Sequence, residues 1–324
     1  MPAPVVAEIV RSGFVEGHHY GSIVALDSSG EVEWAVGDVR EPILPRSCNK
    51  PIQALAMVRL GLRLPPELLA LACASHSGED FHLEGVRRIL DLAGLDESDL
   101  QTPAGYPLDD DARETLLRTG GVPAPIHMNC SGKHAAMLAT CRANGWDTAT
   151  YRSVDHPLQE ATAETFAELT GEEIAIVAVD GCGAPLFPAS LLGLARAFRR
   201  LALGLDGEDR PDPRVTEVAE AIRAHPEYVS GTRRDELALL RAVPGAVGKA
   251  GAESCYAVAL PDGRAIALKT DDGAPRVRPV LMAEALRRSG IDTGPGVDTE
   301  AVRRTGVVAL LGGGDPVGEI RACF

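Results

Sequence analysis

The two ends of the chain are rich in strand-forming residues, and the long segment between them is patterned for helices. Strand-like runs with turn residues occur over 5–36 and 255–269, and the tail 317–321 has the same character. The pattern therefore predicts an α+β fold, in which an antiparallel sheet built from both termini carries an inserted helical lobe. The helices are expected at 51–62, 66–73, 80–94, 132–144, 156–170, 186–203, 212–224, 233–242 and 277–289, and one further strand at 173–179.

The length of 324 residues suits one large domain or two closely packed ones. We predict a single domain over 1–324, with a β-rich part at 1–48 plus 243–324 and a helical lobe at 49–242. Charge and composition argue against nucleic acid as a partner, because the net charge is −14 and aromatic residues are few. No apolar stretch is long enough to cross a membrane, and the N-terminus lacks the basic start of a signal peptide. Seven cysteines in such a chain do not resemble a disulfide scaffold, so we expect a cytoplasmic protein.

The segment from Arg46 to Pro51 contains a serine and a lysine three positions apart, directly before a run with helical spacing. Ser47 and Lys50 would lie about one turn apart at the start of that helix. A serine hydroxyl needs a neighbouring base to attack a carbonyl, and a lysine serves as that base once burial or nearby positive charge favours its neutral form. N–H groups at the helix start would stabilise an oxyanion. The alternative is a capping serine followed by a surface lysine.

Lysine is scarce in this sequence: only four of the 32 basic residues are lysine, and 32 − 4 = 28 are arginine. Arginine cannot lose its proton in a protein, whereas lysine can. A chain that uses arginine for surface charge has reason to keep lysine where a proton must leave, although codon bias explains the same count. The four are Lys50, Lys133, Lys249 and Lys269.

Two other segments have unusual composition. Cys73-Ala74-Ser75-His76-Ser77 ends an apolar run, and a second serine near a lysine is one way to pass a proton to a leaving group. Within this segment, Ser77 is a candidate for the cap of the helix that follows. The glycines of 245–253 do not form a phosphate-binding loop, and instead allow a close backbone approach while presenting Lys249.

A third segment, Asn129 to His134, places a thiol, an amine and an imidazole within one helical turn. Cys182 lies in a loop of similar character, Asp180-Gly181-Cys182-Gly183. By spacing this is a weak metal motif, since zinc signatures rely on close cysteine pairs. Ser131 as a cap with Cys130 as a small buried residue is the structural alternative.

Taken together, these blocks resemble the asparaginase II family of the Rhizobium type. They are Arg46-Ser47-x-x-Lys50-Pro51, Cys73-Ala74-Ser75-His76-Ser77, Asn129-Cys130-Ser131-Gly132-Lys133-His134, Asp180-Gly181-Cys182-Gly183-x-Pro185 and Gly248-Lys249-x-Gly251-Ala252, in this order. The resemblance implies a fold similar to the serine β-lactamases and penicillin-binding proteins, and hydrolysis of L-asparagine to L-aspartate and ammonia by a homodimer. It also implies catalytic pairs of Ser47 with Lys50 and of Ser75 with Lys249.

For the remaining site residues, the resemblance implies one zinc ion on Cys130, Lys133 and Cys182, with a water as a plausible fourth ligand. Arg46, Asp180 and His76 are the expected substrate-binding residues, with Asp180 at the α-ammonium group. Ser47 is the predicted nucleophile, with Ser75 as the alternative. Two other functions fit the same residues: a penicillin-recognising serine hydrolase, and a zinc-dependent binding protein without catalysis.

Overall fold

Residues 2–324 are described by a computed structural model, in which the chain divides into two compact units. The strand unit comprises the chain up to Cys48, Ala189–Leu203 and Ala238–Phe324. The helical unit comprises Asn49–Pro188 and Gly204–Leu237. The single domain expected from the sequence stays a prediction.

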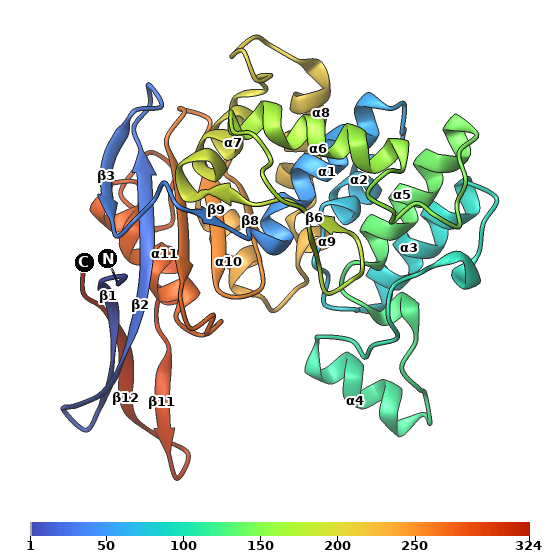
Figure 1. Ribbon diagram of the computed structural model, residues 1–324. Helices are drawn as coiled ribbons and strands as arrows, with labels where there is room; N and C mark the ends of the chain where they lie inside the picture. Colours follow the sequence, from blue (N-terminus) through green and yellow to red (C-terminus); the bar gives the residue numbers. More distant parts are fainter. Residues whose placement is uncertain (1) are drawn as a thin grey trace. The chain divides into compact units, whose positions relative to one another are not determined.

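The strand unit is built on an antiparallel sheet that both termini share, as predicted. Its strand order is β11-β12-β1-β2-β10-β9-β8, and β3 also pairs with β2. Figure 1 shows β1 and β12 side by side, and their register pairs Ile9 with Ile320. The α+β class is therefore confirmed. The strands are β1 (Val5–Arg11), β2 (Phe14–Leu26), β3 (Val32–Val36), β8 (Val247–Ala250), β9 (Cys255–Ala259), β10 (Ala265–Thr270), β11 (Ala309–Gly312) and β12 (Asp315–Ala322).

The centre of this sheet forms the core of the strand unit. Every residue of β9 is buried, which is typical of a strand covered on both faces. Helices α7 (Leu191–Leu203) and α11 (Arg278–Arg288) both pack against β9 and β10. The unit also contains α12 (Thr299–Thr305) and a short pairing of β4 (Pro42–Ile43) with β7 (Ala189–Ser190).

The helical unit is organised around two central helices. Lys50–Val58 of α1 and Ser131–Cys141 of α5 are buried without interruption, whereas a surface helix buries only one stripe. Such helices bury their polar residues too, and these include Lys50 and Lys133. The helices are α1 (Lys50–Arg59), α2 (Pro66–Ala72), α3 (Asp80–Leu92), α4 (Asp110–Arg118), α5 (Ser131–Asn144), α6 (Pro157–Thr170), α8 (Pro213–Ala224) and α9 (Pro226–Val229), and α10 (Asp235–Ala242) follows.

The predicted strand at 173–179 is wrong over most of its length. Only Ala178–Val179 (β5) is extended and paired, against Pro185–Leu186 (β6). Proline has no N–H for a sheet hydrogen bond, and Pro185 within β6 and Pro188 two residues after it both limit the pairing that this segment can offer. No helix within residues 2–324 has the length and apolar character needed to cross a membrane.

Candidate functional site

Ser47 lies in a single 3₁₀ turn, Arg46–Asn49, which runs directly into α1. Pro51 occupies the first turn of α1, as the sequence predicted. The Cys48 amide donates to the Pro45 carbonyl at 3.1 Å, so this N–H is already used and is not open to an oxyanion. Arg46 has a φ of +51°, in the left-handed region that costs a residue with a side chain on the order of 1–3 kcal/mol.

The backbone of β8 approaches this turn closely within the strand unit. The Cys48 thiol donates to the Lys249 carbonyl, with 3.0 Å between sulfur and oxygen. A Cβ atom on Gly251 would lie 2.7 Å from the Pro45 carbonyl oxygen, so no side chain fits there. The predicted close backbone approach by the glycines of 245–253 is confirmed.

Backbone strain is concentrated at the same place. Glu253 and Ser254, just after β8, have φ angles of +55° and +54°. With Arg46 they make three of the five non-glycine residues of 2–324 in the left-handed region. The Arg46 guanidinium lies 3.6 Å from the Glu253 carboxylate, which joins the two strained segments. Strain of this kind persists where packing enforces it, and it clusters at functional sites.

Three of the four lysines are completely buried. Lys50 and Lys133 are 1% exposed and Lys249 is 0% exposed, whereas Lys269 is half-buried. Lysine is almost never fully buried unless a partner compensates for the loss of water. The Lys249 ammonium donates to the Ala250 carbonyl at 2.6 Å. The scarce lysines are therefore mostly buried, whereas the expectation that they release a proton stays a prediction.

Lys50 contacts the second serine of the predicted set. Its ammonium donates to the Ser75 hydroxyl at 3.0 Å and to the Ala74 carbonyl at 2.6 Å. Ser75 is 7% exposed and follows the last turn of α2, where the Ala74 amide still bonds to Leu71. The structure thus joins Lys50 to Ser75 within the helical unit. The pairs Ser47–Lys50 and Ser75–Lys249 stay predictions.

His76 is 0% exposed, and hydrogen bonds engage both of its ring nitrogens. Nδ1 accepts from the Gly78 amide at 3.1 Å, so the ring proton is on Nε2, which donates to the Ser131 hydroxyl at 2.8 Å. Burial is the main cause that lowers the pKa of His76 well below its ordinary value, with His82 and Lys50 adding to it. Its predicted role in substrate binding stays a prediction.

The predicted zinc ligands gather at the start of α5 with one further donor. The side chains of Cys130, His134 and Cys182 place one ligand atom each within 4.8 Å of one another, and all three are buried. The Lys133 ammonium lies 3.2 Å from the Cys182 sulfur. His134 is one helical turn after Cys130, and that spacing was the signal for it as a fourth donor.

The His134 ring is arranged as a metal ligand would be. Its Nδ1 bonds to the Tyr151 hydroxyl at 2.6 Å, while within residues 2–324 no hydrogen bond of ordinary geometry reaches its buried Nε2. With the ring proton on Nδ1, Nε2 presents a lone pair, which is the usual arrangement of a metal-ligating histidine. Two sulfurs, an imidazole and an amine match the four-coordinate preference of zinc.

Electrostatics in this cluster favour one thiolate. A hydrogen bond from Cys130 is the main cause that lowers the pKa of Cys182, and Lys133 lowers it further. The same bond raises the pKa of Cys130, with burial adding to it. Burial alone would lower the pKa of Lys133, but the two sulfurs and Asp180 raise it above its ordinary value. Burial lowers the pKa of His134 to about 4, so its ring is neutral near pH 7.

Asp180 lies beside this cluster, at the start of the turn that carries Cys182. The turn is closed by bonds of Asp180 N–H to the Ala184 carbonyl and of Gly183 N–H to the Asp180 carbonyl. One Asp180 carboxylate oxygen lies 3.7 Å from the Cys182 sulfur. The side chain is only half-buried and therefore keeps access to a ligand.

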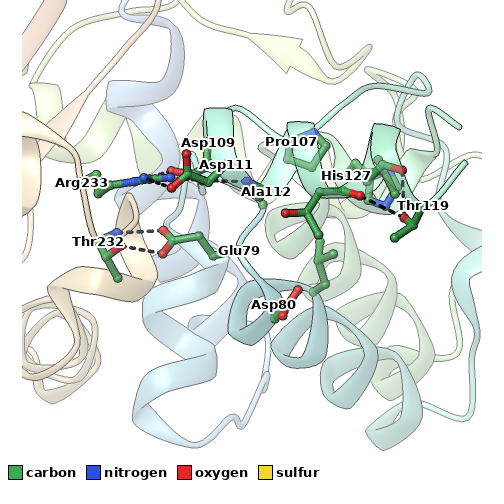
Figure 2. A pocket seen from close by; sticks show the side chains of 14 residues that line it. Glu79, Asp80, Pro107, Asp109, Asp111, Ala112, Thr119, His127, Thr232 and Arg233 are labelled. Atoms are coloured by element: carbon green, nitrogen blue, oxygen red, sulfur yellow. Dashed lines mark hydrogen bonds and ion pairs between the residues drawn. The ribbon is translucent and has the colours of Figure 1, made fainter. Parts of the chain in front are cut away.

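A pocket of about 600 Å³ opens next to the Ser75 segment, between α3, α4 and residues 232–233 (Figure 2). Arg233 lines this pocket and pairs with Asp109 and Asp111 at the start of α4. The Glu79 carboxylate accepts from the amide and hydroxyl of Thr232 at 2.8 and 2.6 Å. These contacts tie the 229–233 segment to the α3 and α4 starts.

The fold and these side chains define a class: an α+β protein with a buried lysine–serine contact and a buried cluster of two thiols and an imidazole that could hold a metal ion. The chain belongs to the L-asparaginase II family, whose sequence pattern it matches over residues 7–322. No functionally curated protein matches it.

Several solved structures show a distant likeness. A β-lactamase from Mycobacterium bovis is 15% identical, with 83% of this chain and 94% of that chain covered and a TM-score of 0.44. The hydrolase EstCE1, described as having promiscuous acyltransferase activity, is 14% identical over 82% and 93% of the two chains, with a TM-score of 0.42. A Bacillus glutaminase is 13% identical over 84% and 91%, with a TM-score of 0.38.

Proposed function

We propose that this protein is an L-asparaginase, which hydrolyses L-asparagine to L-aspartate and ammonia by serine–lysine catalysis. The observation that carries the proposal is the buried Lys50–Ser75 hydrogen bond in a chain of the L-asparaginase II family. Burying an ammonium group is costly, and the family's amide substrate gives this lysine a chemical use.

The proposed reaction begins at Ser47. Its hydroxyl attacks the side-chain amide carbon, and an amine, Lys50 or Lys249, accepts the hydroxyl proton. The carbon–nitrogen bond then breaks, Ser75 relays the proton from that amine to the departing ammonia and so regains its own, and an ester to Ser47 remains. Water hydrolyses this ester to release L-aspartate and the free serine.

Two of the proposed residues are supported by contacts. The Lys50 ammonium is within hydrogen-bond distance of Ser75, so a proton can move between them without a rearrangement. Ser47 lies in the Arg46–Asn49 turn that precedes α1. Ser75 is the alternative nucleophile, since its hydroxyl is the one that contacts a lysine.

Substrate binding is proposed for Arg46, Asp180 and His76. Arg46 and Asp180 are half-buried and carry the charges that an amino acid's carboxylate and ammonium groups require. His76 is enclosed, with both ring nitrogens engaged, so its proposed contribution to substrate binding is indirect and involves no contact with the substrate.

The proposed metal is one zinc ion, held by Cys130, Lys133 and Cys182, with His134 Nε2 beside them. Bound there, zinc would act as a Lewis acid or fix the geometry of the site. Lys133 has to release its proton to become a ligand, and the low pKa of Cys182 prepares that sulfur to bind.

Location and assembly follow the family resemblance. We propose a cytoplasmic homodimer that acts on a small molecule and binds neither nucleic acid nor membrane. Sedimentation equilibrium of the purified protein tests the dimer, and a single species at the mass of one chain would contradict it.

The experiment measures ammonia release from L-asparagine by the wild type, Ser47→Ala and Ser75→Ala. Turnover of nitrocefin, measured separately, tests the alternative of a penicillin-recognising hydrolase. The proposal predicts release by the wild type, none by Ser47→Ala and no nitrocefin turnover. If Ser47→Ala keeps near-normal release while Ser75→Ala loses it, Ser75 is the nucleophile. If folded, zinc-loaded wild type releases no ammonia, the asparaginase proposal is wrong, and the alternative of a zinc-dependent binding protein is favoured.

A further inference from the structure

His76 holds both neighbours of the metal-site cysteine. Its backbone N–H donates to the Asn129 carbonyl at 2.9 Å, and its Nε2–H donates to the Ser131 hydroxyl at 2.8 Å. Asn129 and Ser131 are the residues immediately before and after Cys130. One residue therefore contacts the chain on both sides of a proposed metal ligand, through the backbone of Asn129 and the side chain of Ser131.

The Ser131 hydroxyl extends this contact into the turn before α5. It accepts from His76 and donates to the Ile126 carbonyl at 2.8 Å, so its single proton is already used. The ring of His76 is held in turn by the Gly78 amide on Nδ1. The imidazole thus has one tautomer and one orientation, and the whole arrangement is buried.

His76 also follows Ser75 directly in the chain. The Ser75 amide is anchored to the Val229 carbonyl at 3.0 Å, and its hydroxyl accepts from Lys50 at 3.0 Å. Any displacement of His76 by the Cys130 segment therefore moves the peptide that carries Ser75. Packed cores transmit such shifts because they have no free volume to absorb them.

We propose that His76 is a positioning residue that couples the metal site to Ser75: it grips both flanks of Cys130 and carries their position to the neighbouring serine. Metal bound by Cys130 fixes the 129–131 segment, His76 fixes the Ser75 peptide against it, and the Lys50–Ser75 contact keeps its geometry. This gives His76 a role without substrate contact. The inference rests on the metal site of the proposed function and does not require that the substrate be asparagine.

The test measures zinc affinity by competition with a chromophoric chelator, and the absorption of the Co²⁺-substituted protein. Substitution His76→Asn keeps an acceptor near Nδ1 but loses the donor to Ser131, whereas His76→Gln keeps a donor near Nε2. We expect His76→Asn to weaken zinc binding about 10- to 100-fold, as outer-shell changes at metal sites do, and to alter the Co²⁺ spectrum. His76→Gln should recover most of the affinity.

The matched control is His82→Asn. The His82 ring stacks on that of His76 with 5.2 Å between the ring centroids, but its Nε2 bonds to the Glu227 carbonyl, and within residues 2–324 no hydrogen bond joins its side chain to Asn129 or Ser131. This variant loses a buried imidazole and should keep the zinc affinity of the wild type. Ser131→Ala removes the same hydrogen bond from its other end, so it tests the coupling if His76→Asn does not fold.

At saturating zinc, the coupling predicts that His76→Asn lowers kcat for ammonia release with little change in KM, because Ser75 acts in the transition state. Unchanged zinc affinity and an unchanged Co²⁺ spectrum in both His76→Asn and Ser131→Ala would overturn the coupling. Failure of the wild type to bind zinc would overturn it together with the metal site. If the variants change zinc affinity as expected but the wild type does not hydrolyse asparagine, the coupling is supported and the proposal of asparagine as the substrate is wrong.

Discussion

Replacing Gly251 with alanine places a methyl group in space that the Ser47 turn already fills. The new Cβ would lie 2.7 Å from the Pro45 carbonyl oxygen, 3.2 Å from the Cys48 sulfur and 3.3 Å from the Cys48 nitrogen. Real Cβ atoms essentially never come within 3.0 Å of such an atom, and the nearest one here is backbone. One of the two segments must therefore move.

Overpacking of this kind costs about 1–3 kcal/mol of folding free energy. The turn and β8 are also joined by the Cys48–Lys249 hydrogen bond, so the displacement reaches both Ser47 and the β8 backbone. A misplacement of about 1 Å at a catalytic group costs about 100-fold in rate. We expect Gly251→Ala to lower the urea midpoint modestly and kcat for ammonia release by about that factor.

The matched control is Gly17→Ala in the same unit. Its Cβ would meet only the end of the Ile9 side chain at 3.4 Å, an ordinary contact, so stability and kcat should stay at wild-type levels. Wild-type stability and kcat in Gly251→Ala would refute the close packing. Lost stability with unchanged kcat would refute the link between that packing and Ser47.

Three further predictions follow from charge and pKa. Burial lowers the pKa of His82 to about 4, so the folded protein binds fewer protons than the unfolded chain, and stability is lost as pH falls from the unfolded value of about 6.5 toward 4. His82→Gln should make that decline in unfolding free energy shallower, and an equal slope in both proteins would contradict this. Adding Zn²⁺ to the metal-free protein at pH 7 in weak buffer should release about two protons, one from the Lys133 ammonium and one from the Cys130 thiol, and release of none would count against these ligands. Arg233→Ala should speed proteolysis and amide exchange in α4, because it removes the contacts to Asp109 and Asp111. The control Arg118→Ala should not, since its partner Glu114 lies within α4 itself. Equal rates in the two variants would show that Arg233 does not hold the helix.

The sequence was informative where one local pattern determines one structure. Alternating and β-branched runs at both ends predicted the sheet, and Pro51 predicted the first turn of α1. The run 173–179 has the same composition but no partner strand of matching length, and composition cannot report a partner. Helix α4 was missed because it is short and polar, and its apolar stripe is reduced to Ala112, Leu116 and Leu117, none of which is buried.

The same distinction between local patterns and long-range contacts applies to the candidate site. Lysine scarcity identified Lys50, Lys133 and Lys249 as special, and all three are buried. The contact between Lys50 and Ser75 joins residues 25 positions apart, and no local pattern encodes it. The two bonds by which His76 holds the Cys130 flanks join residues more than fifty positions apart, so folding alone reveals them.

The central claim is that a buried lysine drives amide hydrolysis, and the most direct measurement compares two lysines. Ammonia release from L-asparagine is measured for zinc-loaded wild type, Lys50→Ala and Lys269→Ala, each shown to be folded by circular dichroism. Lys50 contacts Ser75, whereas the half-buried Lys269 donates to the backbone carbonyls of Glu253 and Thr270. The account predicts that release is abolished in Lys50→Ala and retained in Lys269→Ala. Wild-type release in a folded Lys50→Ala would contradict it.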